Sequence, residues 1–590
     1  MAQIVIDGKK IEVSNGKTII EAASENGIYI THFCWHPELS ISGNCRMCLV
    51  EIGMPKKLPD GTYALDSDGN LEISYFPKLQ IACATQVADG MYVKTKSTAA
   101  IKAQESVMEF LLINHPLDCP ICDEAGQCKL QEYAFRNSSG ISRFDEEKVH
   151  AKKHVVWGPY VIFDAERCIK CSRCIRFAQE IVHQDVLSFV NRGDHVTIEL
   201  AKDKQFDNPY SMNVIELCPV GALTSRDFRF KARVWDMSFN DSICSGCSRG
   251  CNIKIGVRNN EVLRIEPKTN PYVNKFWMCD YGRLFQNNLI NQNRVTDSLF
   301  KVDGELKKVD YNTIITETAN KLKKYKPNEI LFLASPLNSV EDNYLFYHFA
   351  KNIVKSENIY FRAINDLLFE DNFLKTSDKT PNLLGVCEVL NKTPKDAISD
   401  DLLVEKLQDT NLKVLYSLDD TVLNIVGIEK VLEKLQLVII HSKNYSEKLH
   451  YANIVLATNY IAETEGTVVN CDKRVQHFTP ALVTSENLRF MGMKMSRLDK
   501  FGAHNDRWNQ FELRHSLPAW KFIKSIIEKY GIKLNYKIAK DVFKDISNTI
   551  KSFNGMTYNL LDEYMGLKLG QAHKPDPKVN IYESYYMKPN

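Results

Sequence analysis

The sequence predicts a multidomain chain of mixed α+β and α/β class. Its 590 residues are 44% apolar and 25% charged, which is typical of globular proteins, and they are too many for one domain. Fifteen of the 17 cysteines lie at or before Cys279, and only Cys387 and Cys471 follow. Beyond residue 300, strand-like and helix-like runs alternate, as in doubly wound α/β domains. We therefore expect two halves with different chemistry, with the metal ligands concentrated in the first.

Residues 1–95 are expected to form a β-grasp domain of the ferredoxin type. Residues 4–13 alternate apolar and polar side chains around an Asp-Gly pair, as a two-stranded hairpin does. Thr18 and Glu21 can form a capping box for a helix with an apolar stripe, and Gly27 can end this helix. Two strands, a helix and a cysteine-bearing loop follow one another, which is the order of a β-grasp ferredoxin.

Four cysteines of this domain form the first ligand group. Three would share one loop, where Gly43 allows a tight bend, and the fourth would come from a later segment, so that they could enclose a [2Fe-2S] cluster. The first gap is ten residues long, whereas plant-type ferredoxins have four. Turn signals in residues 53–77 predict an inserted surface hairpin. The expected ligands are Cys34, Cys45, Cys48 and Cys83.

Residues 96–150 are expected to form a helical domain with the second group. Helical spacing over residues 98–114 leads into the segment His115-x3-Cys119-x2-Cys122-x5-Cys128. Three cysteines leave one position of a [4Fe-4S] cluster without a ligand, and His115 is a candidate for it. The alternative is that His115 is a helix cap or a surface residue, as isolated histidines usually are.

Residues 151–235 are expected to form a ferredoxin-like domain with the third group. Cys168-x2-Cys171-x2-Cys174 can hold three corners of a [4Fe-4S] cubane, and Cys218, followed by Pro219, can supply the fourth. A ferredoxin with two clusters would have a further cysteine at position 178, where this chain has Ala178. One cluster is therefore expected in this domain.

Residues 236–292 are expected to form a small domain with the fourth group. Cys244-x2-Cys247-x3-Cys251 is followed by Cys279 after 27 residues. Four thiolates also suit a tetrahedral zinc ion, so zinc is the alternative for any single group. A third cysteine close to each short pair in groups three and four favours a cubane.

Residues 293–535 are expected to form the doubly wound α/β domain, and residues 536–590 a C-terminal arm. Strand-like runs lie at 330–333, 414–418, 437–441 and 454–457, and Ser339 with Asp342 can cap one of the intervening helices. Cys387 is expected to be a buried core residue. The end of the chain carries Tyr582, Tyr585 and Tyr586 and is predicted to be irregular.

Two segments carry a family resemblance. Gly43-Asn-Cys-Arg-Met-Cys-Leu-Val-Glu51 resembles the N-terminal domains of complex I subunits and of iron hydrogenases. Asn114-His-Pro-Leu-Asp-Cys-Pro120 resembles the large iron-sulfur subunits of NADH:quinone oxidoreductase, respiratory complex I. The resemblance covers nearly the whole chain and implies one [2Fe-2S] and three [4Fe-4S] clusters, with His115 as an imidazole ligand. It also implies that the cluster of the fourth group is a side cluster.

The second half resembles the molybdopterin oxidoreductase superfamily, and the cysteine spacing in residues 236–292 resembles the [4Fe-4S] domain that opens these enzymes. The similar segments are residues 452–457, 463–470 and 474–476, which surround the pterin dinucleotide in catalytic relatives. Residues 280–590 contain only 11 glycines, about 3.5% against the usual ~7%, whereas bound phosphates need close backbone approach. Catalytic relatives also usually extend further. We therefore expect a degenerate domain that binds no molybdenum and no pterin.

The resemblance implies an electron-transfer subunit without a substrate site of its own. Its expected partners are the flavin/NADH-binding subunit, the small [2Fe-2S] subunit, the membrane-proximal two-[4Fe-4S] subunit and other peripheral-arm subunits. The alternative is the catalytic subunit of an NAD-linked formate dehydrogenase-type molybdopterin enzyme. A hydrogenase would need a further cysteine-rich domain, which Cys387 and Cys471 cannot provide.

Charge and hydropathy set the expected location. A net charge of +2 does not favour nucleic acid as a ligand. The first residues resemble neither a signal nor a transit peptide, and apolar runs such as 437–440 are much shorter than the ~20 residues of a membrane span. We expect a peripheral protein on the cytoplasmic side of the bacterial inner membrane, without a span of its own.

Overall fold

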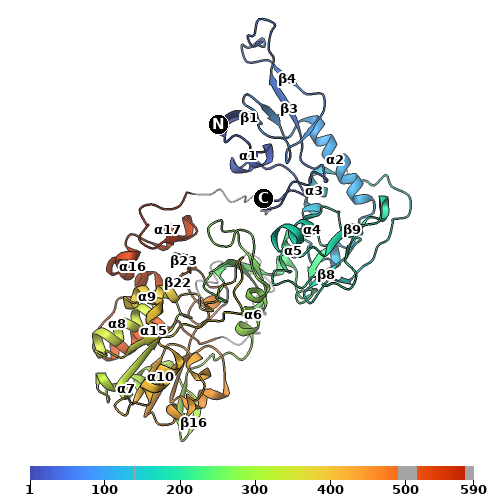
Figure 1. Ribbon diagram of the computed structural model, residues 1–590. Helices are drawn as coiled ribbons and strands as arrows, with labels where there is room; N and C mark the ends of the chain where they lie inside the picture. Colours follow the sequence, from blue (N-terminus) through green and yellow to red (C-terminus); the bar gives the residue numbers. More distant parts are fainter. Residues whose placement is uncertain (139, 489–513, 578–590) are drawn as a thin grey trace. The chain divides into compact units, whose positions relative to one another are not determined.

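The computed structural model describes residues 1–138, 140–488 and 514–577, with the backbone alone for 285–289. The chain divides into two compact units, the first comprising Met1–Asp236 and the second beginning at Met237 (Figure 1). The mixed α and β class expected from the sequence is confirmed.

The first unit begins with a six-stranded sheet and one helix. These elements are β1 (Ala2–Ile6), β2 (Lys9–Val13), α1 (Ile19–Glu25), β3 (Leu49–Pro55), β4 (Ile73–Tyr75), β5 (Gln80–Ile81) and β6 (Tyr92–Lys94). The strand order is β2-β1-β6-β3-β4, with β5 paired to β3, and β6 runs parallel to β1. The β1–β2 turn has positive φ at Asp7 and Gly8, as its Asp-Gly sequence predicts. The predicted capping box of Thr18 and Glu21 opens α1.

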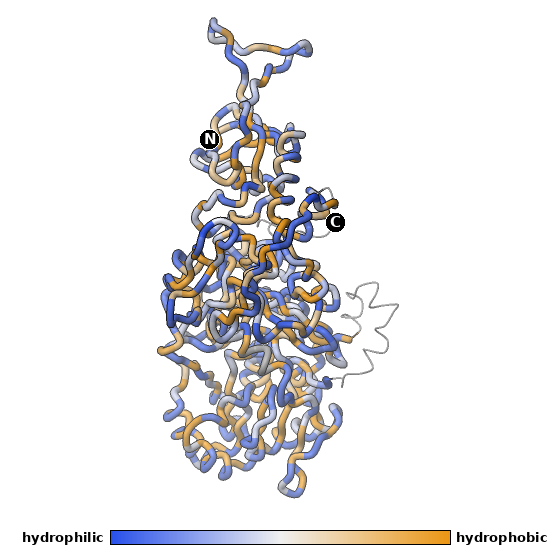
Figure 2. The backbone as a smooth tube through the Cα atoms, turned by 90° about the vertical axis from the view of Figure 1, so that its right-hand side faces the viewer, coloured by the Kyte–Doolittle hydropathy of each residue, from blue (hydrophilic) through white to orange (hydrophobic). Residues whose placement is uncertain are grey.

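The segment between β3 and β4 is a projecting hairpin, as predicted. It ends in two short turns, one closed by a bridge between Lys57 and Tyr63 and the other by a bridge between Leu65 and Leu71. Acidic turn residues and exposed apolar residues alternate along it, and Leu65 is 61% exposed. The hairpin is the extension next to β3 and β4 in Figure 1, and it carries both hydrophilic and hydrophobic stretches in Figure 2.

The rest of the first unit consists of short elements around long loops. Helix α2 (Thr98–Ile113) is capped by Ser97 and confirms the predicted helical spacing. The remaining elements are η1 (Cys119–Ile121), α3 (Lys129–Asn137), β7 (Val155–Val156), β8 (Val161–Phe163), α4 (Arg173–Arg176), the π-helical turn η2 (Phe177–Ile181), β9 (Leu187–Val190), η3 (Gly193–His195), β10 (Thr197–Leu200), α5 (Asn213–Leu217), β11 (Leu223–Ser225) and η4 (Val234–Asp236). Strands β11, β8 and β7 form one small sheet, and β9 and β10 form a hairpin.

The second unit opens with a three-stranded antiparallel sheet of β12 (Ser238–Ile243), β13 (Asn252–Arg258) and β14 (Glu261–Pro267), followed by α6 (Asp280–Asn291). Ile253, Ile255, Val262 and Ile265 form its apolar side. The cysteines of the fourth group lie in the loop between β12 and β13 and immediately before α6.

A seven-stranded sheet forms the centre of the second unit. Its strands are β15 (Leu299–Val302), β16 (Glu305–Lys308), β17 (Ile330–Ala334), β18 (Ile359–Phe361), β19 (Val414–Ser417), β20 (Leu437–Ser442) and β21 (Ile454–Ala457). The order is β16-β15-β21-β20-β19-β17-β18, and the five strands from β17 to β21 are parallel. If these five strands are numbered 1 to 5 along the chain, their order across the sheet is 2-1-3-4-5, the pattern of a doubly wound sheet. Its switch point lies between β17 and β19.

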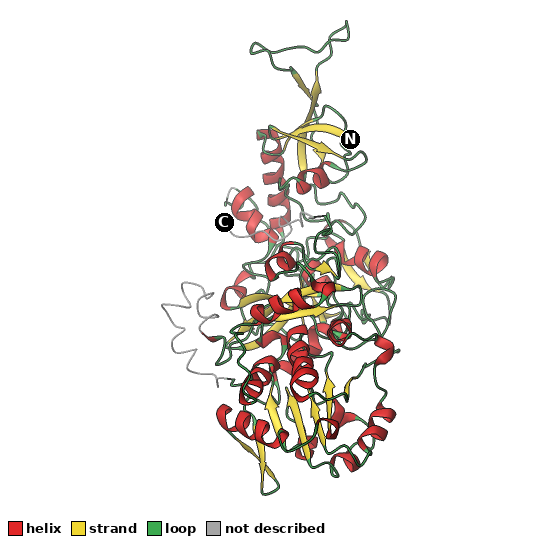
Figure 3. Ribbon diagram, turned by 90° about the vertical axis from the view of Figure 1, so that its left-hand side faces the viewer, coloured by secondary structure: helices red, strands yellow, loops and turns green. Residues whose placement is uncertain are grey.

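Helices cover both faces of this sheet, as Figure 3 shows. Alternate residues of the central strands face two separate cores: Phe332 and Ile439 belong to one, and Leu333 and Val438 to the other. Period-two alternation with both faces buried explains the continuous apolar runs in the sequence. The covering elements include α7 (Tyr311–Leu322), α8 (Val340–His348), η6 (Phe349–Val354), α9 (Leu383–Leu390), α10 (Asp400–Leu407), α11 (Glu429–Leu432) and α15 (Ala519–Lys529), with η5 (Pro327–Glu329), η7 (Pro394–Asp396), η8 (Thr421–Asn424) and η9 (Glu447–Tyr451) in the connections.

The structure differs from the expected C-terminal arm. Residues 539–568 form α16 (Ala539–Thr549), η11 (Lys551–Phe553), α17 (Tyr558–Glu563) and β24 (Leu567–Lys568), which pairs with β23 (Arg474–Phe478) beside η10 (Ile461–Glu463) and β22 (Gly466–Val469). Val542, Phe543 and Ile546 are buried in the main core, because α16 presents an apolar stripe to it. An arm could begin only after this stretch. The tyrosines at 582, 585 and 586 lie outside the described residues.

Among the residues that the structure describes, none of the helices combines the length and apolarity that a bilayer span requires.

Candidate metal centres

The first ligand group gathers where the loop after α1 meets the end of β5. The thiol of Cys34 is within hydrogen-bonding reach of those of Cys45 and Cys83, and Cys83 is in turn within reach of Cys48. Cys34, Cys48 and Cys83 are at most 1% exposed. Four cysteines far apart in sequence therefore meet at one place.

The backbone aims these thiols at one another. Gly43 has φ of +64°, as the tight bend requires, and Arg46 between two of the cysteines has φ of +58°. The amide of Ala82 donates to the carbonyl of Cys48 at 2.9 Å and ties the segment of Cys83 to the loop. Hydrogen bonds from Cys45 and Cys83 lower the pKa of Cys34, and the same contacts raise the pKa of Cys45 and of Cys83.

The second group follows α2. Cys119 begins the short turn η1, Cys122 follows it and is 8% exposed, and Cys128 precedes α3. The guanidinium of Arg233 donates to the carbonyl of Cys122 at 2.6 Å and to that of Pro120. Burial raises the pKa of Cys128 to about 12.

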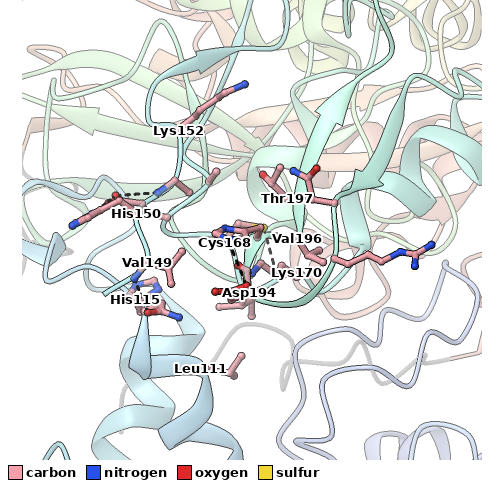
Figure 4. A pocket seen from close by; sticks show the side chains of 18 of the residues that line it. Leu111, His115, Val149, His150, Lys152, Cys168, Lys170, Asp194, Val196 and Thr197 are labelled. Atoms are coloured by element: carbon pink, nitrogen blue, oxygen red, sulfur yellow. Dashed lines mark hydrogen bonds and ion pairs between the residues drawn. The ribbon is translucent and has the colours of Figure 1, made fainter. Parts of the chain in front are cut away.

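His115 lies immediately after α2, and its imidazole is held neutral. Burial, with Lys148 and Arg167 close by, lowers its pKa to about 4. Neutral imidazole is the form that binds metals. The side chain lines a pocket of about 900 Å³ that also contains Cys168 of the third group, as Figure 4 shows. Asp118, one of the charged residues that act on the His115 imidazole, directly precedes Cys119 of the second ligand group.

The third group lines one internal cavity. Cys168, Cys171, Cys174 and Cys218 share its wall with apolar side chains, including Phe163, Ile198 and Leu223. The loop of the first three cysteines winds through two left-handed residues, Lys170 and Ser172, with φ of 58° and 63°. Such non-glycine conformations are costly and occur where the surroundings fix them. The amide of Lys170 points to the Cys168 sulfur at 3.4 Å.

Burial affects the third group and its surroundings. Ala178, where a second cluster would need a cysteine, is fully buried in the π-helical turn η2. Burial raises the pKa of all four thiols, to about 12 for Cys168. Thiols in this setting give up their protons only to a strong positive charge, such as iron.

Buried arginines tie the first group to the third. The guanidinium of Arg176 donates to the carbonyl of Cys34 at 2.6 Å and to that of Cys171 at 3.3 Å. Its neighbour Arg173, 1% exposed, donates to the carbonyls of Trp35 and Leu217 at 2.5 and 3.0 Å. These two residues were not among the site residues predicted from the sequence, although arginines that flank the last cysteine of a C-x2-C-x2-C run are a visible signal.

The second group also packs against the third. The amide of Lys129, next to Cys128, donates to the carbonyl of Pro219, next to Cys218, at 3.0 Å. Two residues on, a Cβ atom at Gly221 would lie only 2.1 Å from the Cys122 sulfur. The segment after Cys218 therefore needs a glycine to leave room for this thiol.

The fourth group lies in the second unit. Cys244, Cys247, Cys251 and Cys279 are each 5–7% exposed. A Cβ atom at Gly282 would lie 3.0 Å from the Cys244 sulfur and 3.6 Å from that of Cys279, so both thiols face the first turn of α6. The amide of Gly282 points to the Cys279 sulfur at 3.4 Å. Lys379, stacked on Tyr281 and Phe369, interacts electrostatically with Cys244, Cys247 and Cys279.

The two remaining cysteines differ from each other. Cys387 lies in α9, is 3% exposed and packs in the main core, as predicted. Cys471 lies in the turn between β22 and β23, and its amide donates to the carbonyl of Ser248 at 2.8 Å, beside the fourth group. The sequence alone predicts no role for Cys471.

Two tests bear on whether these residues suit iron-sulfur clusters. Among the described residues, no three histidine, cysteine, aspartate or glutamate side chains converge on the point of a single metal ion. The donor sets fit clusters in chemistry, because three groups consist of four cysteines each and the third lines a cavity whose other walls are mostly apolar, with Ser172 and Arg173 as the polar exceptions.

The carboxyl edge of the seven-stranded sheet is the place where doubly wound domains bind nucleotides. There the side chain of Asn338, just after β17, donates to the carbonyl of Leu418, just after β19, at 2.6 Å. Helix α8 begins at this point, and its first turn carries Glu341 and Asp342, both at most 5% exposed. A helix N-terminus favours anions, and here the first turn carries two carboxyl groups of the protein itself: Asp342 accepts from Ser339, and Glu341 accepts from Thr467 and Tyr558.

Comparisons with known families divide the chain as its cysteines do. Residues 1–98 match the 2Fe-2S iron-sulfur cluster binding domain, 104–142 the NADH-ubiquinone oxidoreductase-G iron-sulfur binding region, and 158–224 the NADH-quinone oxidoreductase subunit 3 ferredoxin-like domain. Residues 237–288 match the molybdopterin oxidoreductase Fe4S4 domain and 388–489 the molybdopterin oxidoreductase model. Each ligand group thus lies inside one iron-sulfur domain.

Relatives with curated names support the resemblance seen in the sequence. The NADH-ubiquinone oxidoreductase 75 kDa subunit of Reclinomonas americana is 37% identical over 392 residues, which are 65% of this chain and 53% of that protein. NADH-quinone oxidoreductase subunit 3 of Thermus thermophilus is 36% identical over 407 residues, 64% of this chain and 52% of that protein. The chain spans about half the length of these relatives. The solved structure of acetylene hydratase from Pelobacter acetylenicus is 9% identical, with a TM-score of 0.38, over 54% of this chain and 73% of that one.

Proposed function

We propose that this chain is the electron-carrying iron-sulfur subunit of an NADH-quinone oxidoreductase. The observation that carries the proposal is the cavity lined by Cys168, Cys171, Cys174 and Cys218 among apolar side chains. It lies in the region similar to the ferredoxin-like domain of this family, and two further ligand groups contact its loops. The names of the curated relatives point the same way.

The ligand sets favour one [2Fe-2S] cluster at the first group and one [4Fe-4S] cluster at each of the other three. When bound, these clusters would supply one-electron carriers. The chain's own part is to hold them by 15 cysteines and His115, and to exclude water with side chains such as Phe163 and Leu223. The amides of Lys170 and Gly282 would donate to thiolate sulfurs, which moderates their negative charge.

The third group would be the central one of the first unit. Arg176 connects its loop to that of the first group, and the segment after Cys218 packs against the second. The proposed spatial order is therefore first group, third group, second group, which differs from the order of these groups in the sequence. The fourth group belongs to the second unit and is proposed to be a side centre with a largely structural role.

Electrons would reach the chain from a flavin/NADH-binding subunit and a small [2Fe-2S] subunit, and would leave to a membrane-proximal subunit with two [4Fe-4S] clusters. This assignment rests on the resemblance. It makes the chain a peripheral component on the cytoplasmic side of the bacterial inner membrane. Binding of NADH, flavin and quinone is assigned to other subunits.

The second half is proposed to be a degenerate molybdopterin-oxidoreductase-like domain that acts as a scaffold. A formate dehydrogenase-type enzyme would need a pterin dinucleotide at the carboxyl edge of the sheet. Glu341 and Asp342 place two carboxyl groups at the N-terminus of α8, and the bond from Asn338 to Leu418 links the two loops of the switch point. Both features oppose the binding of a diphosphate.

Metal analysis and electron paramagnetic resonance of the purified complex test the proposal together. We expect about 14 iron atoms per chain, matching acid-labile sulfide, and four reduced signals. Zinc in place of iron at one group would overturn the assignment of that group. Stoichiometric molybdenum or a fluorescent pterin derivative would instead support the formate dehydrogenase alternative.

A further inference from the structure

The loops of the first and third groups are interlocked by a set of polar contacts. The side chain of Asn44 donates to the carbonyl of Lys170 at 3.0 Å, and the hydroxyl of Ser172 to that of Ser42 at 3.1 Å. The amide of Ser40 donates to the carboxylate of Glu180 at 2.8 Å. Each contact joins one loop to the other, at separations of more than 120 residues along the chain.

Arg176 is the charged centre of this set. One of its terminal nitrogens donates to both the Cys34 carbonyl and the Cys171 carbonyl, and the other donates to the carbonyl of Ser40. Its Nε donates to the hydroxyl of Ser172 at 3.2 Å. A single planar group therefore fixes a ligand residue of each centre, which the fork of guanidinium donors permits and a lysine could not reproduce.

The burial of this group needs an electrostatic explanation. Arg176 is 7% exposed, and the hydrogen bonds above go to carbonyl and hydroxyl oxygens, which carry no net charge. A buried cation is costly unless nearby negative charge compensates it. The groups that act favourably on its charge include Cys171 and Cys34 in their thiolate forms, together with the exposed Glu180.

We propose that Arg176 is a positioning residue shared by the first and third centres, which holds both ligand loops and makes both centres easier to reduce. The inference rests on the proposed function, since it requires clusters at both groups. Each centre gains one negative charge when it accepts an electron, and a fixed cation beside both stabilises that state. Loss of the cation should therefore lower both midpoint potentials together.

Four variants of the full chain in its complex test this role. Arg176→Gln removes the charge and most donors, and Arg176→Lys keeps the charge but not the fork. Arg233→Gln removes an arginine that donates to two carbonyls of the second-group segment, those of Pro120 and Cys122. Arg143→Gln removes an arginine that is 81% exposed and pairs with Glu109. The readouts are iron content and the midpoint potential of each signal, assigned by cysteine-to-serine changes in each group.

The expected result is a shift to lower potential of both the first and the third signal in Arg176→Gln, with the other two unmoved. Arg176→Lys should shift both less, Arg233→Gln only the second, and Arg143→Gln none. If Arg176→Gln loses iron from both centres, the test passes to the midpoint potentials of Arg176→Lys. A shift of both signals to lower potential supports the inference, and unchanged potentials overturn it. Unchanged potentials, a shift of one centre alone, or an equal shift of all four would overturn the inference.

The outcome also separates this inference from the proposed function. If the unmodified complex lacks the first or the third signal, the proposed function fails. If it has both and they do not respond to Arg176→Gln, only the role of Arg176 fails.

Discussion

Gly221→Ala is the substitution whose effect follows most directly from the structure. The added methyl carbon would lie 2.1 Å from the Cys122 sulfur and 3.1 Å from the Cβ atom of Glu124. Non-bonded heavy atoms sit at about 3.5 Å or more, so the sulfur has to retreat by about 1.4 Å. The backbone angle of Gly221 is outside the left-handed region, so the conflict is purely steric.

The local structure leaves the thiol of Cys122 few ways to move. Arg233 holds the carbonyl of Cys122 at 2.6 Å, so a backbone shift would break that bond. A change of rotamer would turn the sulfur away from its group. Overpacking of this kind costs about 1–3 kcal/mol, and here the cost falls on a ligand. We expect Gly221→Ala to lose the cluster of the second group, about four iron atoms, while the first and fourth groups keep theirs.

Two other glycines beside cysteine sulfurs provide a graded comparison. A Cβ atom at Gly246 would lie 3.5 Å from the Cys244 sulfur, an ordinary contact, so Gly246→Ala should keep full iron. Gly282→Ala, at 3.0 Å from the same sulfur, should be intermediate. Iron analysis and electron paramagnetic resonance of the three purified complexes rank the effects. Full iron and an unshifted second-group spectrum in Gly221→Ala would refute the steric argument.

Three further predictions follow from the remaining sites. His115→Cys should lower the midpoint potential of the second centre, because a thiolate adds negative charge; an unchanged potential and spectrum would mean that His115 is not a ligand. Cys247→Ala should remove the fourth cluster yet leave NADH-to-quinone flux, and loss of flux in an assembled complex with its other clusters intact would put this centre on the route. Burial raises the pKa of Glu341 from 4.5 to about 7, so the folded state binds a proton that the unfolded state has released between these values. Stability should therefore fall as pH rises from about 4.5 to 7, by up to ~3 kcal/mol, and urea unfolding of Glu341→Gln should lack this dependence.

Local signals in the sequence predicted much of the fold. The capping boxes at Thr18 and Ser339 form as expected, because the Ser or Thr and its acidic partner three residues on need only each other. The strand runs of the second half were also visible, because buried parallel strands are apolar throughout. The strand order was not, since it depends on pairing between segments far apart in the chain.

The C-terminal segment illustrates the limit of a composition argument. Residues 539–568 were assigned to an arm, yet the helical spacing of Val542, Phe543 and Ile546 was available in the sequence. The sequence does not show the surface against which this apolar stripe packs. Helix α8, about 200 residues earlier in the chain, contributes to that surface.

For the candidate metal centres too, local patterns were predictable from the sequence and long-range contacts were not. Cysteine spacing predicted which residues belong together. The structure brings the thiols of the first group together, as it does those of the third, and it places Cys244 and Cys279 of the fourth at the first turn of α6, while the ligand sets and their clusters remain predictions. The contacts between groups could not be predicted. Arg176 and Gly221 act on residues of another group, and nothing in the local pattern of either residue names its partner.

The loop of the fourth group has a consequence for the timing of synthesis. Its backbone is held from far downstream: the Asn470 side chain donates to the carbonyl of Arg249 at 3.2 Å, and the Gln476 side chain to that of Gly250 at 3.0 Å. Ribosomes add about 5–20 residues per second, so more than 220 residues separate the two segments by roughly 10–45 seconds. During that interval the thiols of Cys244, Cys247 and Cys251 lie in a loop that lacks the segment holding its backbone. A nascent chain stalled before residue 470 should therefore react with a thiol-specific alkylating reagent at Cys247, and one stalled well beyond residue 570 should resist it.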